Sequence, residues 1–398
     1  MQLNGRGDRA PTRKWGIKDI FDMIDNFTEI QNIKVALVHD WLNGMRGGEK
    51  CLEQICQWFP DAPIYTLICD KDKLSSIIQG RKIITSKIQK YPFWRKKYRY
   101  YLPFFSGAIE KFDFSEYDIV ISTSHCVAKS AITKKETCHL CYCFTPMRYV
   151  WQFHNEYFKK GFKSIMIKRL LNRLRKWDLE TSNRVDYFAA ISENVRTRIK
   201  QFYKRDSEII YPPCDTEFFN IIDNFKKDEF YLIVSALVPY KRIDLAIEAF
   251  NKLNRPLKII GGGTDISSLK KIAGNNIEFL GWQPSEVIRE YYNKARAVIF
   301  PGEEDLGIVP IEAQACGTPV IAYGKGGVLE TVIEEKTGLF FCEQEADKIV
   351  DIVNEFEKLS FNRHDLRENA LNFSKDIFEK RMKEFIIEKC KAFQQDYL

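Results

Sequence analysis

Short apolar runs alternate along this chain with longer segments in which apolar residues recur every three or four positions. The short runs indicate buried parallel strands, and the periodic segments indicate amphipathic helices. The expected strands are Lys34–Val38, Tyr117–Ser122, Thr137–Cys143, Val185–Ile191, Tyr231–Ser235, Leu257–Ile260, Ile277–Leu280, Ala297–Phe300 and Pro319–Ala322. This alternation predicts the α/β class, with parallel sheets covered by helices.

The strand at Ala297–Phe300 is followed by a polar loop, Pro301–Gly307, that contains three successive acids. A helix is expected from about Val309 to Ala315, ended by Gly317. Open α/β sheets bind ligands beyond the carboxyl ends of their strands, which is where this loop lies.

Two acids of this region, Glu304 and Glu312, have seven residues between them and are expected to face one cleft. Carboxylates accept hydrogen bonds from vicinal hydroxyls, as in a sugar or a ribose. The backbone N–H groups near the helix start are candidates for holding a diphosphate; they belong to Leu306, Gly307, Ile308 and Val309. The alternative is a solvated acidic loop before an ordinary helix, since acids favour helix N-termini.

The segment EEDLGIVPIEAQACGTPVIAY, from Glu303 to Tyr323, resembles the E-x7-E block of the family-4 retaining glycosyltransferases and the strand that follows it. The resemblance covers most of the chain from Lys34 to about Phe378 and is greatest to bacterial mannosyltransferases of O-antigen and exopolysaccharide assembly. It implies the GT-B fold, two facing Rossmann-like domains with parallel sheets and an interdomain cleft. It also implies that Glu312 binds the ribose and Glu304 the hexose of a nucleotide sugar.

Four segments are expected in this organisation. They are an N-terminal extension (1–32), an acceptor domain (33–213), a nucleotide-sugar domain (214–378) and a C-terminal helix that returns to the first domain (379–398). The two prolines before Cys214 favour an extended path and mark the connector between the domains.

Several further residues are candidates for binding the sugar donor. Gly47 and Gly48 precede a helix and match glycines that approach the diphosphate in the resembled family, although a tight turn would also need glycine. Lys241 matches the lysine of the family's R-x4-K pattern, but Ala236 occupies the arginine position, and Arg242 is the candidate replacement. The remaining matches are Gly261 and Gly263, and Trp282 and Gln283 beside the base.

On the acceptor side, His125 follows a strand and matches a family histidine beside the transferred sugar, where it is expected to bond a hydroxyl. The resemblance makes Glu304, His125 and Lys241 the expected catalytic residues. His39 and Arg148 are candidates for contacting the acceptor. A lone histidine is more often structural, which is the alternative for His125.

No metal and no cofactor other than the nucleotide sugar is expected. Asp70 and Asp72 form an Asp-x-Asp that is more simply a solvated turn. His139, Cys141 and Cys143 share one face of a predicted strand, but the ligand spacing of a zinc site is absent.

The chain of 398 residues has a net charge of +7, which suits an anionic partner. Residues 87–105 and 159–176 combine basic and apolar side chains, and they are expected to contact an anionic membrane peripherally. The alternative is a core-facing helix with a solvated basic face. The scattered cysteines fit a reducing cytosol, and neither a signal peptide nor a membrane span is expected.

These features together predict a retaining glycosyltransferase on the inner face of the membrane. It would move a hexose, mannose from GDP-mannose, to a glycan or polyprenyl-linked acceptor in cell-surface polysaccharide synthesis, without a metal and without nucleic acid. A UDP-sugar donor, a GT-B sugar-nucleotide epimerase and a basic nucleic-acid-binding protein are the alternatives. Front-face attack and a covalent intermediate both remain open as routes to retention.

Overall fold

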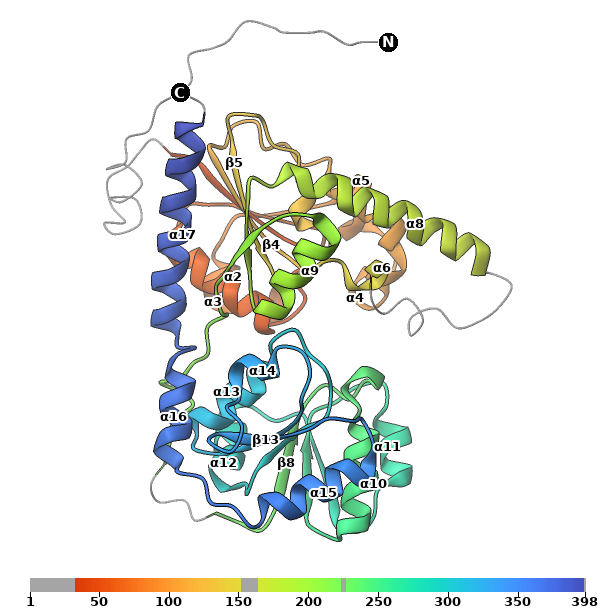
Figure 1. Cartoon of the computed structure of the whole chain (residues 1–398). Helices are drawn as coiled ribbons and strands as arrows, with labels where there is room; N and C mark the ends of the chain where they lie inside the picture. The colour runs from red at the N-terminus through yellow and green to blue at the C-terminus, as the bar shows by residue number, and fades with distance from the viewer. Residues whose placement is uncertain (1–32, 152–163, 223–226, 397–398) are drawn as a thin grey trace, which may run out of the picture. The chain divides into compact units, whose positions relative to one another are not determined.

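The computed structural model describes residues 33–151, 164–222 and 227–396, and these divide into two compact units (Figure 1). Of the described residues, unit 1 contains those up to Ala190, Arg198–Glu208 and those from Arg381 onward. Unit 2 contains Ile191–Thr197 and Ile209–Lys380. The expected N-terminal extension, residues 1–32, lies outside the described residues.

Within the described residues, unit 1 is built on a seven-stranded sheet of order β3-β2-β1-β4-β5-β6-β7. The strands are β1 (Val35–His39), β2 (Ile64–Thr66), β3 (Ile83–Thr85), β4 (Ile119–Ser124), β5 (Cys138–Cys143), β6 (Tyr187–Ala190) and β7 (Ser207–Ile209). Strands β1 to β6 pair in parallel. The strand order reverses between β1 and β4, which are neighbours in the sheet although β2 and β3 separate them in sequence.

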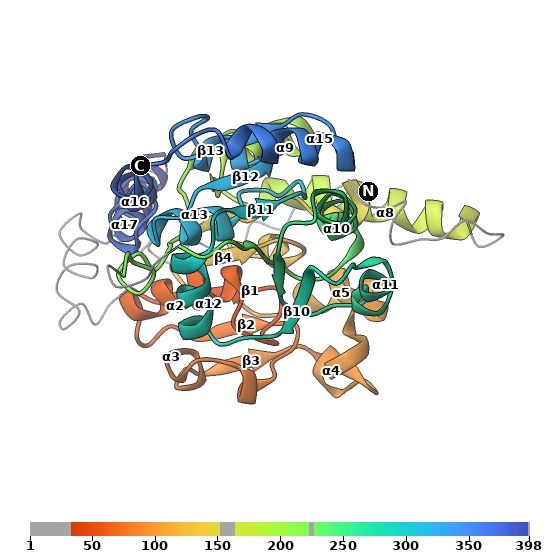
Figure 2. The same ribbon diagram turned by 90° about the horizontal axis from the view of Figure 1, so that it is seen from below.

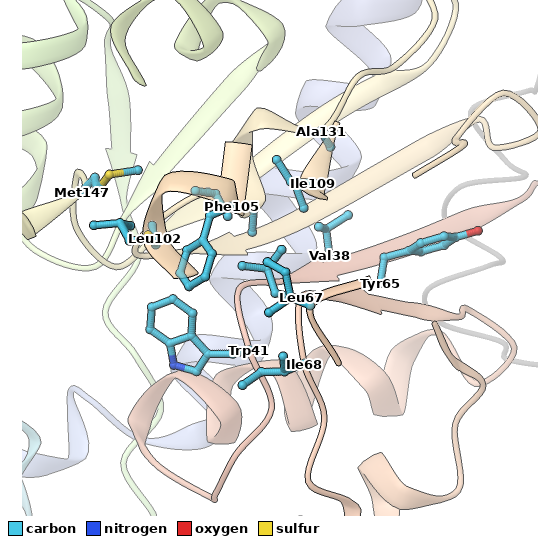
Figure 3. Close-up of a cluster of buried hydrophobic side chains, with 14 of the residues drawn as sticks. Val38, Trp41, Tyr65, Leu67, Ile68, Leu102, Phe105, Ile109, Ala131 and Met147 are labelled. Carbon is cyan, nitrogen blue, oxygen red and sulfur yellow. The ribbon is translucent and has the colours of Figure 1, made fainter. Parts of the chain in front are cut away.

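The helices of unit 1 are short except for α2 and the helices in its C-terminal half. They are α2 (Gly47–Trp58), α3 (Ser76–Gln79), α4 (Trp94–Lys97), α5 (Leu102–Ile109), α6 (Arg148–Trp151), α8 (Ser164–Thr181) and α9 (Glu193–Tyr203, which begins in unit 2), with 3-10 turns η1 (Lys71–Lys73), η2 (Lys87–Lys90), η3 (Tyr98–Tyr101), η4 (Ala128–Ser130) and η5 (Ser182–Arg184). Helices α5 and α8 contribute to a buried aromatic and aliphatic core in which Trp41, Leu102 and Phe105 lie together (Figure 3).

Unit 2 is built on a six-stranded parallel sheet, in its described residues, of order β10-β9-β8-β11-β12-β13. The strands are β8 (Tyr231–Val234), β9 (Leu257–Ile260), β10 (Ile277–Gly281), β11 (Val298–Phe300), β12 (Val320–Tyr323) and β13 (Gly338–Phe341). The order reverses between β8 and β11. The sequence of each of these strands is almost wholly apolar because helices cover both faces of the sheet.

The helices of unit 2 follow a doubly wound pattern. They are η6 (Pro239–Lys241), α10 (Ile243–Leu253), α11 (Ile266–Ile272), α12 (Ser285–Lys294), α13 (Ile308–Ala315), α14 (Val328–Thr331), α15 (Ala346–Phe356), α16 (Arg363–Leu371) and the start of α17 (Lys375–Gln395). Helices α10, α11 and α15 cover one face of the sheet, and α12 and α13 cover the other (Figures 1 and 2). Side chains of the first group form the main core of the unit with Tyr231, Ile299 and Ile321.

The long helix α17 contributes its second half to unit 1. Cys390 Sγ lies 4.0 Å from Cys138 Sγ of β5. Lys389 forms an ion pair with Glu208, and the Lys383 ammonium lies over the Trp58 ring. Among the helices in the described ranges, none combines the length and the apolar content needed to cross a membrane.

Candidate active site

Unit 2 carries an ion pair at the point where its strand order reverses. Lys241 lies in the loop after β8, and Glu304 lies in the loop after β11, the adjacent strand. The Lys241 ammonium contacts the Glu304 carboxylate directly, and both side chains are largely buried. Ligands of open α/β sheets bind at such a reversal, beyond the carboxyl ends of the strands. Two of the predicted site residues are therefore brought together at the expected place.

Glycines allow the loops around this ion pair to approach one another. A Cβ atom on Gly302 would lie 3.0 Å from Lys241 Cα, and one on Gly263 would lie 2.1 Å from the carbonyl oxygen of Leu237. A backbone oxygen at 2.1 Å leaves no room for a Cβ, so position 263 requires glycine, and a Cβ at position 302 would make a tight contact with the backbone of Lys241. The loops after β8, β9 and β11 consequently form one contiguous surface around Lys241.

Glu312, the second acid of the E-x7-E pattern, lies on α13 and is mostly buried. Its Oε2 accepts a hydrogen bond from the hydroxyl of Tyr292, at 3.2 Å. Tyr292 is fully buried on α12, and burial raises the pKa of its hydroxyl well above the usual value. Tyr292 therefore remains a hydrogen-bond donor and restricts the orientation of the Glu312 carboxylate.

The Arg242 side chain is engaged by its own helix. Arg242 has a left-handed backbone, with φ of 51°, and its guanidinium lies 3.3 Å from the Asp244 carboxylate. A second cation, Lys325, lies 3.3 Å from Glu303 on the adjacent acidic loop. Its loop is fixed against that acidic loop because the N–H of Gly327 donates to the carbonyl of Glu304 at 2.9 Å.

The other predicted residues of unit 2 lie at the same edge of the sheet. Gly307 has φ of 84° and immediately precedes α13, whose first residue is Ile308. Leu306 is buried, whereas Trp282 is 79% exposed. Gln283 donates from Nε2 to the carbonyl of Leu280. An exposed indole beside β10 is available for stacking on a planar ring.

Unit 1 has a comparable arrangement where its own strand order reverses, between β1 and β4. His39, at the end of β1, is fully buried and shares a hydrogen bond of 2.7 Å between its Nδ1 and Thr123 Oγ1. Burial lowers its pKa to about 3, so the ring is neutral at pH 7. Gly48 lies beside it, because a Cβ there would be 3.6 Å from the His39 ring and 3.1 Å from that of Phe144. Gly47 is the first residue of α2.

Asp40 organises the loop that carries His125. Its fully buried carboxylate accepts backbone N–H bonds from His125, Cys126, Val127 and Ala128, at 2.6 to 2.9 Å. The Nδ1 atom of His125 lies 3.1 Å from Asp40 Oδ2. Burial lowers the pKa of His125, an effect that the Asp40 charge opposes.

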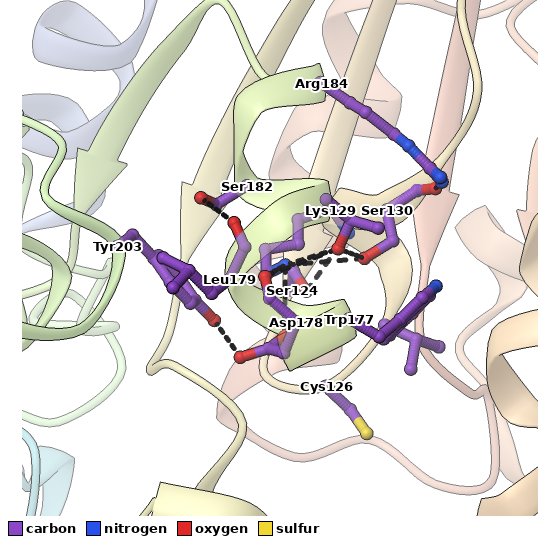
Figure 4. A network of polar contacts seen from close by, with 12 residues as sticks. Ser124, Cys126, Lys129, Ser130, Trp177, Asp178, Leu179, Ser182, Arg184 and Tyr203 are labelled. Atoms are coloured by element: carbon purple, nitrogen blue, oxygen red, sulfur yellow. Dashed lines mark hydrogen bonds and ion pairs between the residues drawn. The ribbon is translucent and has the colours of Figure 1, made fainter. Parts of the chain in front are cut away.

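Behind this loop a buried ion pair joins Lys129 to Asp178 of α8 (Figure 4). The Lys129 ammonium lies 3.0 Å from Asp178 Oδ1, and neither side chain is accessible to solvent by more than 1%. Asp178 Oδ2 accepts hydrogen bonds from Trp151 Nε1 at 2.7 Å and from the Tyr203 hydroxyl at 2.9 Å. Trp151 ends α6, which begins at Arg148, so the Asp178 carboxylate connects the loop of Lys129 with the helix of Arg148.

The segments considered for metals are engaged by other groups. His139 shares a hydrogen bond with Ser122 Oγ at 2.9 Å through Nε2, and its Nδ1 lies 3.0 Å from the carbonyl of Arg184. Asp70 forms ion pairs with Lys73 and Arg95. Cys141 and Cys143 are buried in β5, as the strand interpretation expects.

The first basic segment, 87–105, folds as short helical turns that leave Phe93, Tyr100 and Phe104 exposed.

In the second basic segment, 159–176, residues 159–163 lie outside the described residues. In its described part, Leu171 and Leu174 pack into the unit 1 core while Lys168 and Arg169 face solvent. The described part of the second segment is therefore a helix with one face in the core and a basic face in solvent, which is the alternative expected from the sequence.

Three residues of these sites were not singled out from the sequence: Asp40, Tyr292 and Lys325. Asp40 and Tyr292 act through partners distant in the sequence. Lys325 lies in a glycine-rich run, Gly324–Gly327, that directly follows a predicted strand. A loop of this kind at the end of a strand is a sequence signal for a binding residue.

Comparison with known proteins decides the family. The family "Glycosyltransferase Family 4" matches residues 45–218, and "Glycosyl transferases group 1" matches residues 215–373. The chain belongs to the family-4 glycosyltransferases. Together the two matches extend from residue 45 to residue 373 and cover most of both units of this glycosyltransferase.

Several relatives of this glycosyltransferase are known by name. It is 29% identical over 199 residues to an uncharacterized glycosyltransferase of Methanocaldococcus jannaschii, covering 48% of this chain and 55% of that protein. It is 33% identical over 140 residues to a GDP-mannose-dependent alpha-(1-6)-phosphatidylinositol monomannoside mannosyltransferase of Mycolicibacterium smegmatis. The match covers 31% of this chain and 37% of that protein. The chain thus spans about half or less of the length of these two relatives. An alpha-1,3/1,6-mannosyltransferase of Candida albicans is 22% identical, over 76% of this chain and 84% of that protein.

Solved structures confirm the expected fold class. Anabaena Alr3699/HepE in complex with UDP has a TM-score of 0.68 at 17% identity, covering 89% of this chain and 99% of that one. The sucrose-phosphate synthase of Thermosynechococcus elongatus has a TM-score of 0.68 at 18% identity. The match covers 91% of this chain and 100% of that one. The fold of this glycosyltransferase is therefore GT-B, with two Rossmann-like units.

Proposed function

We propose that this glycosyltransferase binds a nucleotide sugar at the strand reversal of unit 2 and transfers the hexose with retention. The observation that carries the proposal is the contact between Lys241 and Glu304. A cation and a carboxylate from adjacent loops supply the two kinds of group that a nucleotide sugar requires. The carboxylate accepts hydrogen bonds from hexose hydroxyls, and the ammonium opposes the charge of a diphosphate.

The leaving group explains why the lysine is needed. Cleavage of the glycosidic bond transfers negative charge to the departing diphosphate, and preorganised cations and N–H groups stabilise that charge. Lys241 and the N–H groups of residues 306–309, all in unit 2, are assigned this role. Glu312, restrained by Tyr292, is assigned the ribose hydroxyls.

GDP-mannose is the proposed donor, and a glycan or polyprenyl-linked glycan the proposed acceptor. The named mannosyltransferase relatives support this choice of donor. The UDP complex of a structural neighbour makes UDP-sugars the alternative to test.

A transfer assay with radiolabelled GDP-mannose, UDP-glucose and a polyprenyl-linked glycan tests the proposal. We expect transfer from GDP-mannose, and we expect Glu304→Gln and Lys241→Met to reduce it at least about a hundredfold, as loss of one transition-state contact does. Lys252→Met is the matched control, because it removes an exposed ion pair with Asp347 in the same unit. Conversion of the nucleotide sugar to its epimer without acceptor would show the epimerase alternative instead.

We also propose that residues 87–105 contact an anionic membrane surface on its cytoplasmic side. Three exposed aromatic side chains, Phe93, Tyr100 and Phe104, occur here among lysines and arginines. This combination suits the interface of anionic lipid, where rings insert and cations remain near headgroups. An acceptor anchored in lipid would be presented at such a surface.

Flotation with phosphatidylglycerol and phosphatidylcholine vesicles tests this contact. We expect recovery with the anionic vesicles only, lost when the three rings are replaced by serine. Serine at Ile272, Leu359 and Leu371, which are exposed in unit 2, is the control. Equal recovery of both triple variants would contradict the proposal.

A further inference from the structure

The fully buried carboxylate of Asp40 has more neighbours than a structural role requires. A carboxylate offers about four lone-pair positions. Four backbone N–H groups, those of residues 125–128, already fill them. The His125 ring is a fifth group, with Nδ1 at 3.1 Å from the oxygen that also accepts the N–H groups of His125 and Cys126.

The position of the proton on His125 follows from that distance. A neutral imidazole has one N–H and one nitrogen lone pair. A lone pair on Nδ1 would face a carboxylate oxygen and be repelled, whereas a proton there is attracted. The group beside one ring nitrogen fixes the tautomer in this way. Nδ1 therefore carries the proton, and Nε2 carries the lone pair.

The ring is also held in place from a second direction. Trp41 packs edge-on against it, with ring centroids 4.4 Å apart and planes at 86°. The His125 side chain is 29% exposed, so the ring is anchored on one side and open to solvent on another. Burial and the charges of Arg46, Arg99 and Arg148 lower its pKa while Asp40 raises it, and the net lowering leaves a neutral ring at pH 7.

We propose that Asp40 is a positioning residue that fixes the backbone of residues 125–128 and keeps the His125 proton on Nδ1, so that Nε2 accepts a hydrogen bond from a substrate hydroxyl. The substrate contact rests on the proposed function; the tautomer does not. The chemistry selected at this atom is a hydroxyl that donates its hydrogen. A carbonyl, an ether oxygen or a phosphate oxygen has no hydrogen to offer, and the Nε2 lone pair would repel it.

Nitrogen NMR of the full-length protein labelled with 15N-histidine tests the tautomer without substrate. At pH 8 we expect the His125 signals, assigned by their loss in His125→Gln, to show a protonated Nδ1 and an unprotonated Nε2. A protonated Nε2 would overturn the proposal. This result is independent of the sugar donor and acceptor, so inactivity with every nucleotide sugar would count against the proposed function alone.

Turnover tests whether Asp40 acts through His125. Asp40→Asn places an amide among N–H donors, so we expect turnover to fall on the order of a hundredfold, as misplacement of a reacting group does. Affinity for the nucleotide, which unit 2 is proposed to bind, should change less than about twofold. The control is Asp186→Asn. Among the described residues, the only hydrogen bond to the Asp186 carboxylate comes from the backbone N–H of His139, at 2.7 Å. This variant should retain turnover within about twofold.

The double variant Asp40→Asn/His125→Gln decides between positioning and an independent role. If Asp40 acts through His125, the double variant is no slower than His125→Gln within about twofold, since coupled residues are not additive. A further tenfold loss in the double variant would overturn the proposal. If Asp40→Asn does not fold, the NMR result on the unmodified protein decides alone.

Discussion

Replacement of Lys129 by methionine tests the buried polar network behind the loop that carries His125. Methionine keeps most of the apolar length of the side chain but removes the ammonium that lies 3.0 Å from Asp178. The ammonium also donates to the Asp178 carbonyl at 2.7 Å and to Thr181 Oγ1 at 3.2 Å. The variant therefore leaves a buried carboxylate without its cation.

The expected cost can be worked out from the surroundings of that carboxylate. Breaking a buried ion pair by removing one partner costs about 3 to 5 kcal/mol. The hydrogen bonds from Trp151 and Tyr203 to Asp178 remain, which favours the lower end, about 3 kcal/mol. With a urea dependence of about 2.5 kcal/mol per molar, the unfolding midpoint should fall by about 1.2 M.

Tryptophan fluorescence during urea unfolding reports on unit 1, the unit that contains Lys129. Of the tryptophans in the described residues, all but Trp282 belong to unit 1. The control is Lys176→Met on α8, the helix of Asp178, which removes an exposed pair with Glu180 and should shift the midpoint by less than about 0.2 M. A Lys129→Met midpoint within about 0.3 M of the wild type would refute the reasoning, because that shift corresponds to only about a quarter of the predicted loss of about 3 kcal/mol.

Three further outcomes are expected. Tyr292→Phe removes the hydrogen bond to Glu312, worth about 1 kcal/mol, so nucleotide affinity measured by calorimetry should fall about fivefold. Gly263→Ala would place a Cβ 2.1 Å from a carbonyl oxygen and should abolish nucleotide binding, whereas Gly262→Ala, with open space around it, should not. Burial lowers the pKa of His139 to about 4, below its unfolded value of about 6.5, so stability should be full above pH 6.5 and fall as the pH drops toward 4. Urea midpoints at pH 7 and 5 should therefore diverge more in the wild type than in His139→Gln.

The fold class was predictable because buried parallel strands are apolar along their whole length. The strand Leu257–Ile260 has the expected ends. The strand expected from Tyr117 instead begins at Ile119, and Asp118, just before it, accepts the N–H of Lys34. Such a contact depends on a residue far away in the sequence and leaves no local pattern.

The candidate site was predictable to the extent that its groups follow strands. Lys241 and Glu304 each come after a strand that adjoins the order reversal, so topology brings them together. The supporting groups were not predictable, because their roles depend on packing. Asp40 bonds a loop about 85 positions away, and Tyr292 reaches Glu312 from another helix. The loop bonded by Asp40 and the carboxylate bonded by Tyr292 cannot be identified from residue type or spacing.

The most direct test of the central claim is calorimetric titration of nucleotide sugars into the wild type, Lys241→Met and Lys252→Met. The account predicts that the wild type and Lys252→Met bind GDP-mannose with equal affinity, in preference to UDP-glucose and ADP-glucose. It predicts that Lys241→Met binds GDP-mannose at least about tenfold more weakly, since hydrogen bonds to charged groups contribute about 1.5 to 3 kcal/mol. Undiminished binding by Lys241→Met would contradict the placement of the diphosphate at the strand reversal of unit 2.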